Sequence, residues 1–401
     1  MGSKRLVFVR FAVIILILGL LLQGCASSKF QLYDQQEKDR SGESGTGDAQ
    51  VPDLLAQPGE ERSDSENNPE EGNSQQENDS GNTDGSAGDK DVPEPIDLEK
   101  VKPNEAGRIM VVMFHNFIEK YEQGDKDYTT TFDDFRKLLE TLYNDGYRLI
   151  NLNDYLNGNI DVPAGCIPMV FTFDDGTAGQ FSLTEENGEL KVNPDSAVGI
   201  MEEFNRLHPD FGLKGTFFVY LGNKNTFGKT GTLEQRLRYL IGKGFEIGNH
   251  TYTHINLKKD GKTAEIIQKE IGGNQKAMYE LIPGYTFTAF SLPFGAPSTD
   301  LMEYVIKGEY EGTVYENKAI MEVGWDPAQS PFSIKFDPLS VHRVRSSGIE
   351  PVDADLGWWL ENMKRSNEFV SDGDPDTVTV PESYADLVDR EKLGGRKLVI
   401  Y

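Results

Sequence analysis

The sequence predicts an α/β fold in which parallel strands and helices alternate, arranged as a (β/α) barrel or as an incomplete one. Three observations support this prediction. About 295 residues follow the polar N-terminal part of the chain, enough for one large domain with a substantial core. Strand-like and helix-like patterns alternate six or seven times along them, without a visible repeat. The most apolar run, residues 169–173, has the unbroken β-branched and aromatic composition of a strand buried on both faces.

The other predicted strands are short apolar runs bounded by turn-forming residues. They span residues 108–114, 148–152, 215–220, 245–249, 287–292 and 339–344. Polar residues interrupt the alternation at 184–193, where we expect an excursion loop or a small hairpin. The C-terminal stretch, residues 366–401, ends in an apolar run that suggests an edge strand.

Helices are predicted where apolar residues recur at helical spacing between start and stop signals. The first begins after Thr131 as N-cap, has Asp134 three residues later, and stops at Gly146. The others span residues 197–207, 233–243, 263–281, 298–307 and 353–364.

The N-terminus has the pattern of an export signal. Basic residues precede a short apolar core at residues 11–22, and Leu22-Gln-Gly-Cys25 resembles a bacterial lipoprotein signal. We therefore expect a signal peptide at 1–25 and a lipid on Cys25 that attaches the protein to the membrane. A transmembrane anchor is the alternative, although the apolar run is shorter than the roughly 20 residues a span needs. With Cys25 acylated, Cys166 is the only remaining thiol, so no intrachain disulfide is expected.

Residues 26–105 are expected to be a disordered tether rich in Ser, Gly and Asn. They contain 21 acidic and 7 basic residues, a net charge of −14 within the chain's −26. Such a segment buries too little apolar surface to fold and extends by self-repulsion. The acidity argues against nucleic acid as a partner. The predicted location is the outer face of the bacterial cytoplasmic membrane, with the domain at 106–401 extending into the cell wall.

Two clusters of polar residues follow predicted strands. Asp174 and Asp175 end the most apolar strand, and such strand ends face the ligand crevice in α/β proteins. A metal or a shared proton would relieve the repulsion between the two carboxylates. The simpler interpretation is a solvated Asp-Asp-Gly turn. His250 and His254 follow another strand, and their spacing is expected to place both imidazoles on one side of a helical turn. Two histidines and a carboxylate form a known catalytic zinc set, although a surface or core pair of histidines would look the same.

Taken together, these motifs resemble those of the polysaccharide deacetylases, carbohydrate esterase family 4 with the NodB homology domain. Residues 172–176 (TFDDG) match the first motif of the family and residues 249–254 (NHTYTH) match the second. Residues 215–219 match the strand between them, and residues 292–295 (LPFG) are similar to the third motif. The resemblance spans about 109–344 and implies an irregular seven-stranded barrel.

The resemblance implies a metal-dependent hydrolase that removes acetyl groups from N-acetylated glycans. Asp175, His250 and His254 would hold a divalent metal, most simply Zn²⁺, and Asp174 would be the general base. The metal would lower the pKa of a water molecule toward about 7. A backbone N–H near Phe294 would stabilise the oxyanion.

The chain departs from the family pattern at several positions. Ser291 stands where the third motif has an arginine that orients the base, so Arg343 or Arg345 is expected to replace it. His342 is a loose match for the general acid of the fifth motif, and Trp325-Asp326 for the fourth. The expected catalytic residues are thus Asp174, His342 and Arg343. The expected substrate-binding residues are His115, Pro293, Phe294, Gly295 and Trp325.

Several alternatives stay open. The missing arginine and the first strand suggest the subgroup acting on exopolysaccharides such as poly-N-acetylglucosamine. The sequence does not separate this substrate class from peptidoglycan, chitin-like glycans or xylan. A glycan-binding protein without turnover, and a deacetylase of O-acetyl esters, are alternative functions. Trp358 and Trp359 are compatible with stacking on sugar rings or with packing against the core.

Overall fold

The computed structural model describes residues 96–122, 128–324, 326–346 and 354–401. The predicted signal peptide and most of the predicted tether lie outside these ranges, as does Trp325. The described residues belong to one compact unit, Glu94–Tyr401. None of its described helices combines the length and the apolar composition needed to cross a membrane.

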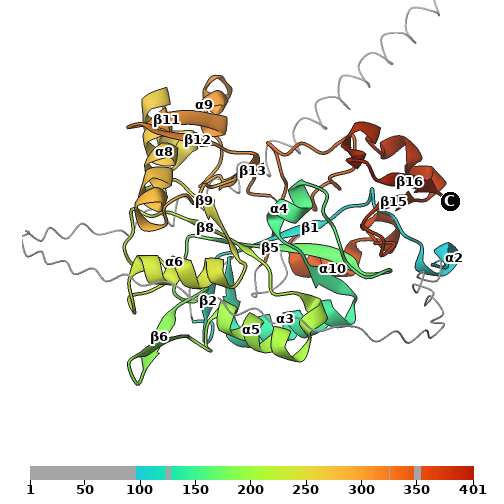
Figure 1. Ribbon diagram of the computed structural model, residues 1–401, viewed down its shortest axis with the longest axis horizontal. Coiled ribbons are helices and arrows are strands. Elements are labelled where there is room, and N and C mark those ends of the chain that lie inside the picture. Colours follow the sequence, from blue (N-terminus) through green and yellow to red (C-terminus); the bar gives the residue numbers. More distant parts are fainter. Residues whose placement is uncertain (1–95, 123–127, 325, 347–353) are drawn as a thin grey trace, which may run out of the picture. The chain divides into compact units, whose positions relative to one another are not determined.

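A parallel sheet forms the centre of this unit (Figure 1). Its strand order is β13-β10-β9-β8-β5-β1-β14, and β4 pairs with the first half of β5. β5 has all eight residues buried, as its apolar sequence predicts. The strands are β1 Met110–Phe114, β4 Tyr147–Leu149, β5 Ile167–Asp174, β8 Thr216–Val219, β9 Glu246–Asn249, β10 Ala289–Ser291, β13 Ala319–Met321 and β14 Val344–Arg345.

The sheet closes on itself through residues 341–345. Val341 forms a parallel bridge with Met321 of β13, at one end of the strand order. Three residues later, Val344 pairs with Val112 of β1, at the other end. One short extended segment therefore joins both ends of the sheet. The predicted fold class, an irregular (β/α) barrel, is confirmed.

Helices lie between the strands in sequence, as predicted, and α3, α5 and α6 line one side of the sheet in Figure 1. The predicted cap of α3 is present, because the Thr131 side chain accepts a hydrogen bond from the Asp134 amide at 3.1 Å. The helices are α2 Leu98–Val101, α3 Phe132–Asn144, α4 Leu152–Leu156, α5 Ala197–Leu207, α6 Leu233–Gly242, α7 Leu257–Asp260, α8 Ala264–Leu281, α9 Met302–Ile306 and α10 Leu356–Asn362.

Four two-stranded sheets surround the barrel, and they account for most differences from the predicted elements. The polar stretch at 184–193 is a hairpin, β6 Leu183–Glu186 with β7 Glu189–Val192. The helix predicted at 298–307 ends at Ile306, because β11 Lys307–Tyr310 begins a second hairpin with β12 Thr313–Glu316. β2 Asn116–Ile118 pairs with β3 Thr129–Thr131. At the C-terminus, β15 Thr377–Val380 and β16 Lys397–Ile400 form a separate parallel pair rather than an edge strand of the main sheet.

The folded part begins earlier than the boundary expected at residue 106. α2 is already helical, and Asn104 and Glu105 are buried. The amide of Asn104 donates to the carbonyl oxygen of Val370, and the amide of Glu105 to that of Thr379. The C-terminal segment thus provides hydrogen-bond partners that the polar composition of residues 26–105 could not reveal.

Candidate metal and catalytic site

The candidate site lies at the carboxyl ends of β5, β9 and β10. Asp174 is the last residue of β5 and Asp175 follows it, while His250 follows β9 and Ser291 ends β10. Parallel strands bring their carboxyl ends to one edge of a sheet, which is why residues distant in sequence meet here.

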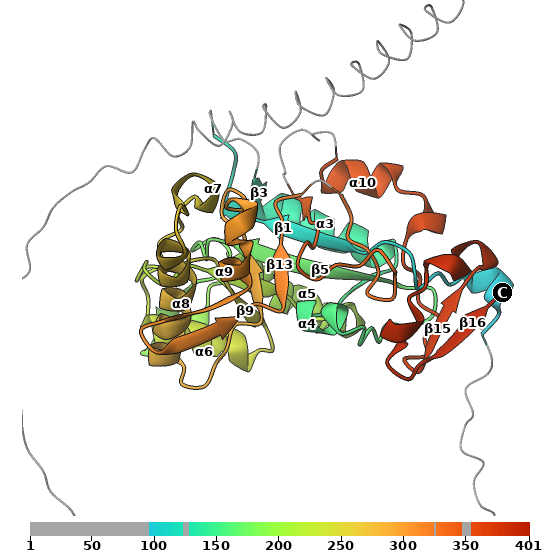
Figure 2. The ribbon, with the colours of Figure 1, turned by 90° about the horizontal axis from the view of Figure 1, so that it is seen from above.

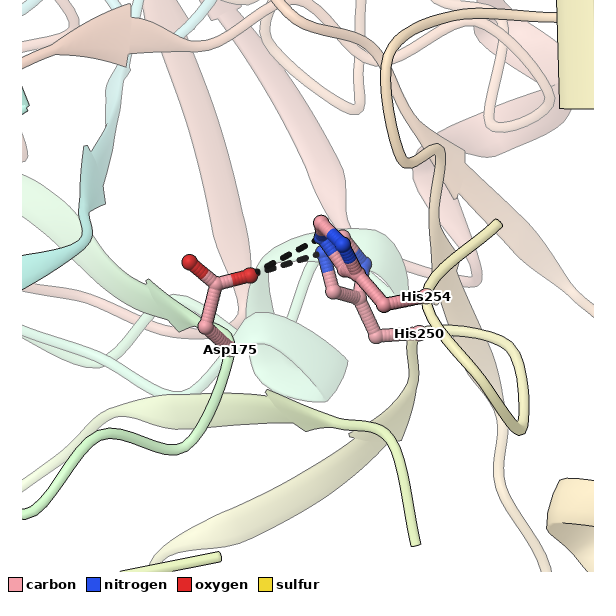
Figure 3. Close-up of side chains that lie close together, drawn as sticks. All are labelled: Asp175, His250 and His254. Atoms are coloured by element: carbon pink, nitrogen blue, oxygen red, sulfur yellow. Dashed lines mark ion pairs between the residues drawn. The ribbon is translucent and has the colours of Figure 1, made fainter. Parts of the chain in front are cut away.

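Asp175, His250 and His254 form a group with the dimensions of a metal site (Figure 3). Nε2 of His250 lies 3.5 Å and Nε2 of His254 lies 3.0 Å from Oδ1 of Asp175. Nδ1 of His250 is 2.9 Å from the carbonyl oxygen of Ser291. With a proton on Nδ1 for that bond, the lone pair of Nε2 points toward Asp175.

The chemistry of these three residues fits a divalent metal. Oδ1 of Asp175 is buried and accepts no hydrogen bond, although two imidazole nitrogens face it. Burial opposes the ionisation of Asp175, but the two histidines outweigh it and hold the pKa well below its usual range. One carboxylate oxygen and two imidazole nitrogens form a ligand set that would suit a divalent metal, zinc among them.

The loop between the two histidines is not the helical turn that their spacing suggested. Thr251 has φ +63° and His254 has φ +60°, so the chain bends back through left-handed backbone conformations. The amide of Thr251 donates to Oδ1 of Asn249 at 3.0 Å, and the amide of Thr253 donates to Oε2 of Glu270 at 2.9 Å. These side-chain acceptors, rather than helical hydrogen bonds, bring the imidazoles together.

Strained backbone is concentrated at this site. Besides Thr251 and His254, Asp175 has φ +81° and Phe294 has φ +57°. Each such non-glycine conformation costs on the order of 1 kcal/mol or more, and persists where surrounding contacts impose it. The strain directs the side chains of Asp175 and His254 toward one another.

Asp174 is fixed by a buried arginine. Nη1 and Nη2 of Arg343 donate to Oδ1 and Oδ2 of Asp174, both at 2.8 Å. The hydroxyl of Ser291 donates to Oδ2 of Asp174 at 3.0 Å and accepts from Nη2 of Arg343 at 2.9 Å. Burial alone would raise the pKa of Asp174, but the Arg343 guanidinium lowers it to about 2. Of the two arginines expected to replace the missing one, Arg343 is the partner, and Arg345 lies over the ring of Tyr128.

His342 does not reach this site. Successive residues of an extended segment point to opposite sides, so Arg343 faces inward and His342 outward. The imidazole lies 3.6 Å from Asp326 and 3.7 Å from Glu322, and its side chain is 46% exposed. Asp326 raises the pKa of His342. The position of His342 therefore does not support the general-acid role expected for it.

His115 is the imidazole that faces Asp174 instead. Its Nε2 lies 3.9 Å from Oδ2 of Asp174, and its ring packs edge-on against Tyr128. Burial lowers the pKa of His115 to about 4, so the ring is neutral at pH 7. Tyr128 was not predicted, because a lone tyrosine in a polar loop has no sequence pattern that marks it.

Two aromatic rings flank His254 and form part of the wall of the site. The ring of Phe294 lies 4.9 Å and that of Tyr220 lies 5.3 Å from the imidazole, between centroids. Pro293 is buried next to Phe294, and Gly295 has φ +111°. Trp325 is outside the described residues, while Asp326, from the same predicted motif, pairs with Arg108 and His342.

A second buried arginine supports the turn after Asp175, and the sequence did not indicate it. Arg236 of α6 donates to the carbonyl oxygens of Thr226 at 2.9 Å, Gly231 at 2.7 Å and Lys224 at 2.8 Å. In the same loop, the amide of Phe227 donates to the carbonyl oxygen of Gly176 at 2.7 Å. Arg236 thus holds the loop that contacts the Asp175–Gly176 turn.

Comparison with protein families identifies a domain that includes these motifs. Residues 161–312 match the family described as polysaccharide deacetylase. Asp174, Asp175, His250 and His254 all lie within the match. The resemblance noted in the sequence is therefore confirmed over this segment. No match was found among the curated proteins.

Several solved structures are similar to the chain at low sequence identity. The deacetylase PplD of Streptococcus pyogenes, in complex with acetate, is 15% identical, with a TM-score of 0.47 over 64% of this chain and 98% of that one. BC0361, a polysaccharide deacetylase from Bacillus cereus, is 18% identical, with a TM-score of 0.47 over 64% and 69%. IcaB from Ammonifex degensii is 16% identical, with a TM-score of 0.43 over 60% and 92%.

Proposed function

Since residues 161–312 match the polysaccharide deacetylase family, we propose that the protein is a metal-dependent hydrolase that removes acetyl groups from N-acetylated glycans. This proposal is best supported by two adjacent carboxylates, one suited to binding a metal and the other to accepting a proton. Asp175 presents an unpartnered oxygen to two imidazoles, while Asp174 is kept ionised by Arg343.

A divalent metal bound by Asp175, His250 and His254 would polarise the acetyl carbonyl and lower the pKa of an attacking water molecule. Asp174 accepts the proton of that water, and its two hydrogen bonds to Arg343 keep the carboxylate ionised and oriented. A backbone N–H near Phe294 stabilises the negative charge that develops on the carbonyl oxygen.

The leaving amine needs a proton, and we assign its delivery to His115. It is neutral and lies 3.9 Å from Asp174, so it can take up the proton that Asp174 accepted and pass it to the amine. The His115 side chain is only 16% exposed, and its contact with Tyr128 helps to hold the ring in this position. This assignment replaces the general-acid role expected for His342.

The alternative of a glycan-binding protein without turnover loses part of its support. It was motivated by Ser291 in place of the usual arginine and by the weak fourth and fifth motifs. Arg343, which directly precedes β14, provides the missing guanidinium, and Ser291 contributes a hydroxyl to the same cluster. Among substrates, we favour an exopolysaccharide such as poly-N-acetylglucosamine, with peptidoglycan and chitin-like glycans as the alternatives.

The location that goes with this proposal is outside the cell, with a lipid on Cys25 and the acidic tether extending through the cell wall.

Acetate release from N-acetylglucosamine oligomers, peptidoglycan and acetylated xylan, with added zinc or with chelator, tests the proposal. We expect release from an N-acetylated substrate that chelator stops. Asp174→Asn should lose turnover by about 10²–10⁴-fold while keeping the metal, whereas His254→Ala should lose both. Full activity of Asp174→Asn would contradict the mechanism, and release from acetylated xylan alone would favour the esterase alternative.

A further inference from the structure

A second concave site lies at the other end of the barrel. A pocket of about 340 Å³ opens beside Gly107 and Arg108, which precede β1, whereas the candidate catalytic site lies at the carboxyl ends of the strands. Its walls come from residues 106–108, residues 326–335, the end of α10 and the C-terminal segment. α10 and the β15–β16 pair lie on the same side of the barrel (Figures 1 and 2). A volume of this size accommodates one or two sugar rings.

Two aromatic side chains line this pocket. Trp359 of α10 packs partly against the barrel core and edge-on against Trp358, with ring centroids 4.8 Å apart. Tyr384 of the C-terminal segment packs partly against a cluster of buried apolar side chains that includes Phe369, and its hydroxyl donates to Oδ1 of Asn367. Because both rings are half-buried and supported from behind, they offer rigid apolar surfaces at little conformational cost.

The lining of the pocket carries more basic than acidic groups, although the protein as a whole is acidic. Its charged lining groups are Arg108, Asp326, Lys335 and Lys364. Arg108 pairs with Asp326 at 2.5 Å through Nη1 and also donates from Nη1 to the carbonyl oxygen of Pro327. Lys335 and Lys364 are exposed, and no carboxylate within the described ranges pairs with either ammonium. A chain with net charge −26 thus presents two unpaired cations beside two aromatic rings.

We propose that this pocket binds an acidic saccharide, with a sugar ring against Trp359 and its negative group between Lys335 and Lys364. The side-chain amide of Gln329 also lines the pocket and can bond to sugar hydroxyl groups. A nucleotide would offer a similar combination of flat ring and negative charge. The choice of a saccharide rests on the proposed function. The saccharide bound here is distinct from poly-N-acetylglucosamine, the favoured substrate, which carries no negative group.

Binding of two hexasaccharides of equal size tests the proposal. Hyaluronan hexasaccharide contains N-acetylglucosamine and carboxylates, and chitohexaose contains N-acetylglucosamine alone. Isothermal titration to the chelator-treated protein, which is expected not to turn over substrate, should give a Kd for hyaluronan at least about tenfold lower than for chitohexaose. The preference should decrease as salt rises from 50 to 500 mM, because exposed charges are screened.

Variants in which the charge of the pocket lysines is reversed test whether hyaluronan binds in this pocket. Lys335→Glu/Lys364→Glu should weaken hyaluronan binding by about tenfold or more, while the rate of acetate release from N-acetylglucosamine oligomers stays within about twofold. The control Lys269→Glu/Lys307→Glu makes the same change of net charge at exposed lysines outside the pocket and should bind normally. Trp359→Tyr keeps an aromatic ring and should bind more tightly than Trp359→Ala.

Three results would overturn the proposal: equal affinity for the two hexasaccharides, equal losses in the pocket and control variants, or tighter binding of a nucleoside diphosphate than of hyaluronan. Failure of the proposed function looks different. Absent acetate release together with lysine-dependent binding of hyaluronan would disprove the deacetylase mechanism and leave the pocket assignment intact.

Discussion

Two buried carboxylates of this protein have opposite properties. Asp174 and Glu105 are 2% and 3% exposed. Arg343 lowers the pKa of Asp174 to about 2, whereas burial, reinforced by Asp372, raises the pKa of Glu105 to about 8. Glu105 accepts from the amide of Thr379 at 2.7 Å and from that of Asp372 at 3.4 Å, but no described cation pairs with it.

The comparison shows that the partner, rather than the depth of burial, decides the charge of a buried acid. A base must be ionised to accept a proton, so the site at the end of β5 includes a guanidinium despite the cost of burying both charges. Glu105 joins the start of the domain to the C-terminal segment, and a neutral carboxyl can make those hydrogen bonds without a counterion. Substitutions at four positions test this difference between the two carboxylates.

Arg343→Met should have the largest effect. It leaves Asp174 buried without a counterion, which typically costs about 3–5 kcal/mol of stability, and the misplaced base should lower turnover by about 10²-fold or more. Denaturant unfolding and acetate release measure the two effects. Adding Asp174→Asn to the same protein should recover part of the stability but none of the activity, because no charge is then left unpaired. Equal stability of the single and double variants would contradict the role given to the ion pair.

Glu105→Gln should change how stability depends on pH. The pKa of Glu105 is raised from 4.5 to about 8 by folding. Between those pH values the carboxyl of Glu105 stays protonated in the folded protein but is ionised in the unfolded chain. The contribution of this proton to the free energy of unfolding is therefore full below about pH 4.5 and is lost as pH rises through 8. The slope of unfolding free energy between pH 5 and 8 should therefore be less negative in the variant, by up to about 1.4 kcal/mol per pH unit. The exposed Glu99→Gln serves as the control, and a slope unchanged by Glu105→Gln would show that Glu105 is not protonated.

Ser291→Ala should have a moderate effect at the same site as Arg343. It removes one hydrogen bond to Asp174 and one to Arg343 but leaves the ion pair in place. We expect a loss of about 1 kcal/mol in stability and a decrease of less than about tenfold in kcat. A loss as large as that of Arg343→Met would mean that the hydroxyl, not the guanidinium, orients the base.

His342→Ala should have the smallest effect, because this imidazole faces Glu322 and Asp326 on the outer side of its segment. Acetate release should stay within about twofold of the parent, as for other exposed side chains away from a site. His115→Ala, the matched change at the inward imidazole, should lower kcat by about 10²-fold. A larger loss of activity in His342→Ala than in His115→Ala would restore the general-acid role first expected for His342.

The fold class and the central residues of the site could be predicted from the amino-acid sequence. The apolar runs and capping signals predicted β5, α3, α5 and α8 closely, because these patterns reflect local preferences of the chain and burial on one or two faces. Asp174, Asp175, His250 and His254 could be identified because they follow predicted strands and match family motifs.

Tertiary structure decided which side chains complete that site. Arg343 is 169 residues from Asp174 in sequence, and its guanidinium reaches the base only because residues 341–345 close the barrel in one register. A shift of one residue in that register would exchange the faces of Arg343 and His342. The approach of the two imidazoles likewise depends on hydrogen bonds to Asn249 and Glu270. The protonation of Glu105 depends on its burial against the C-terminal segment. Local sequence patterns do not include these distant contacts, so the charges and orientations that depend on them arise only when the chain is folded.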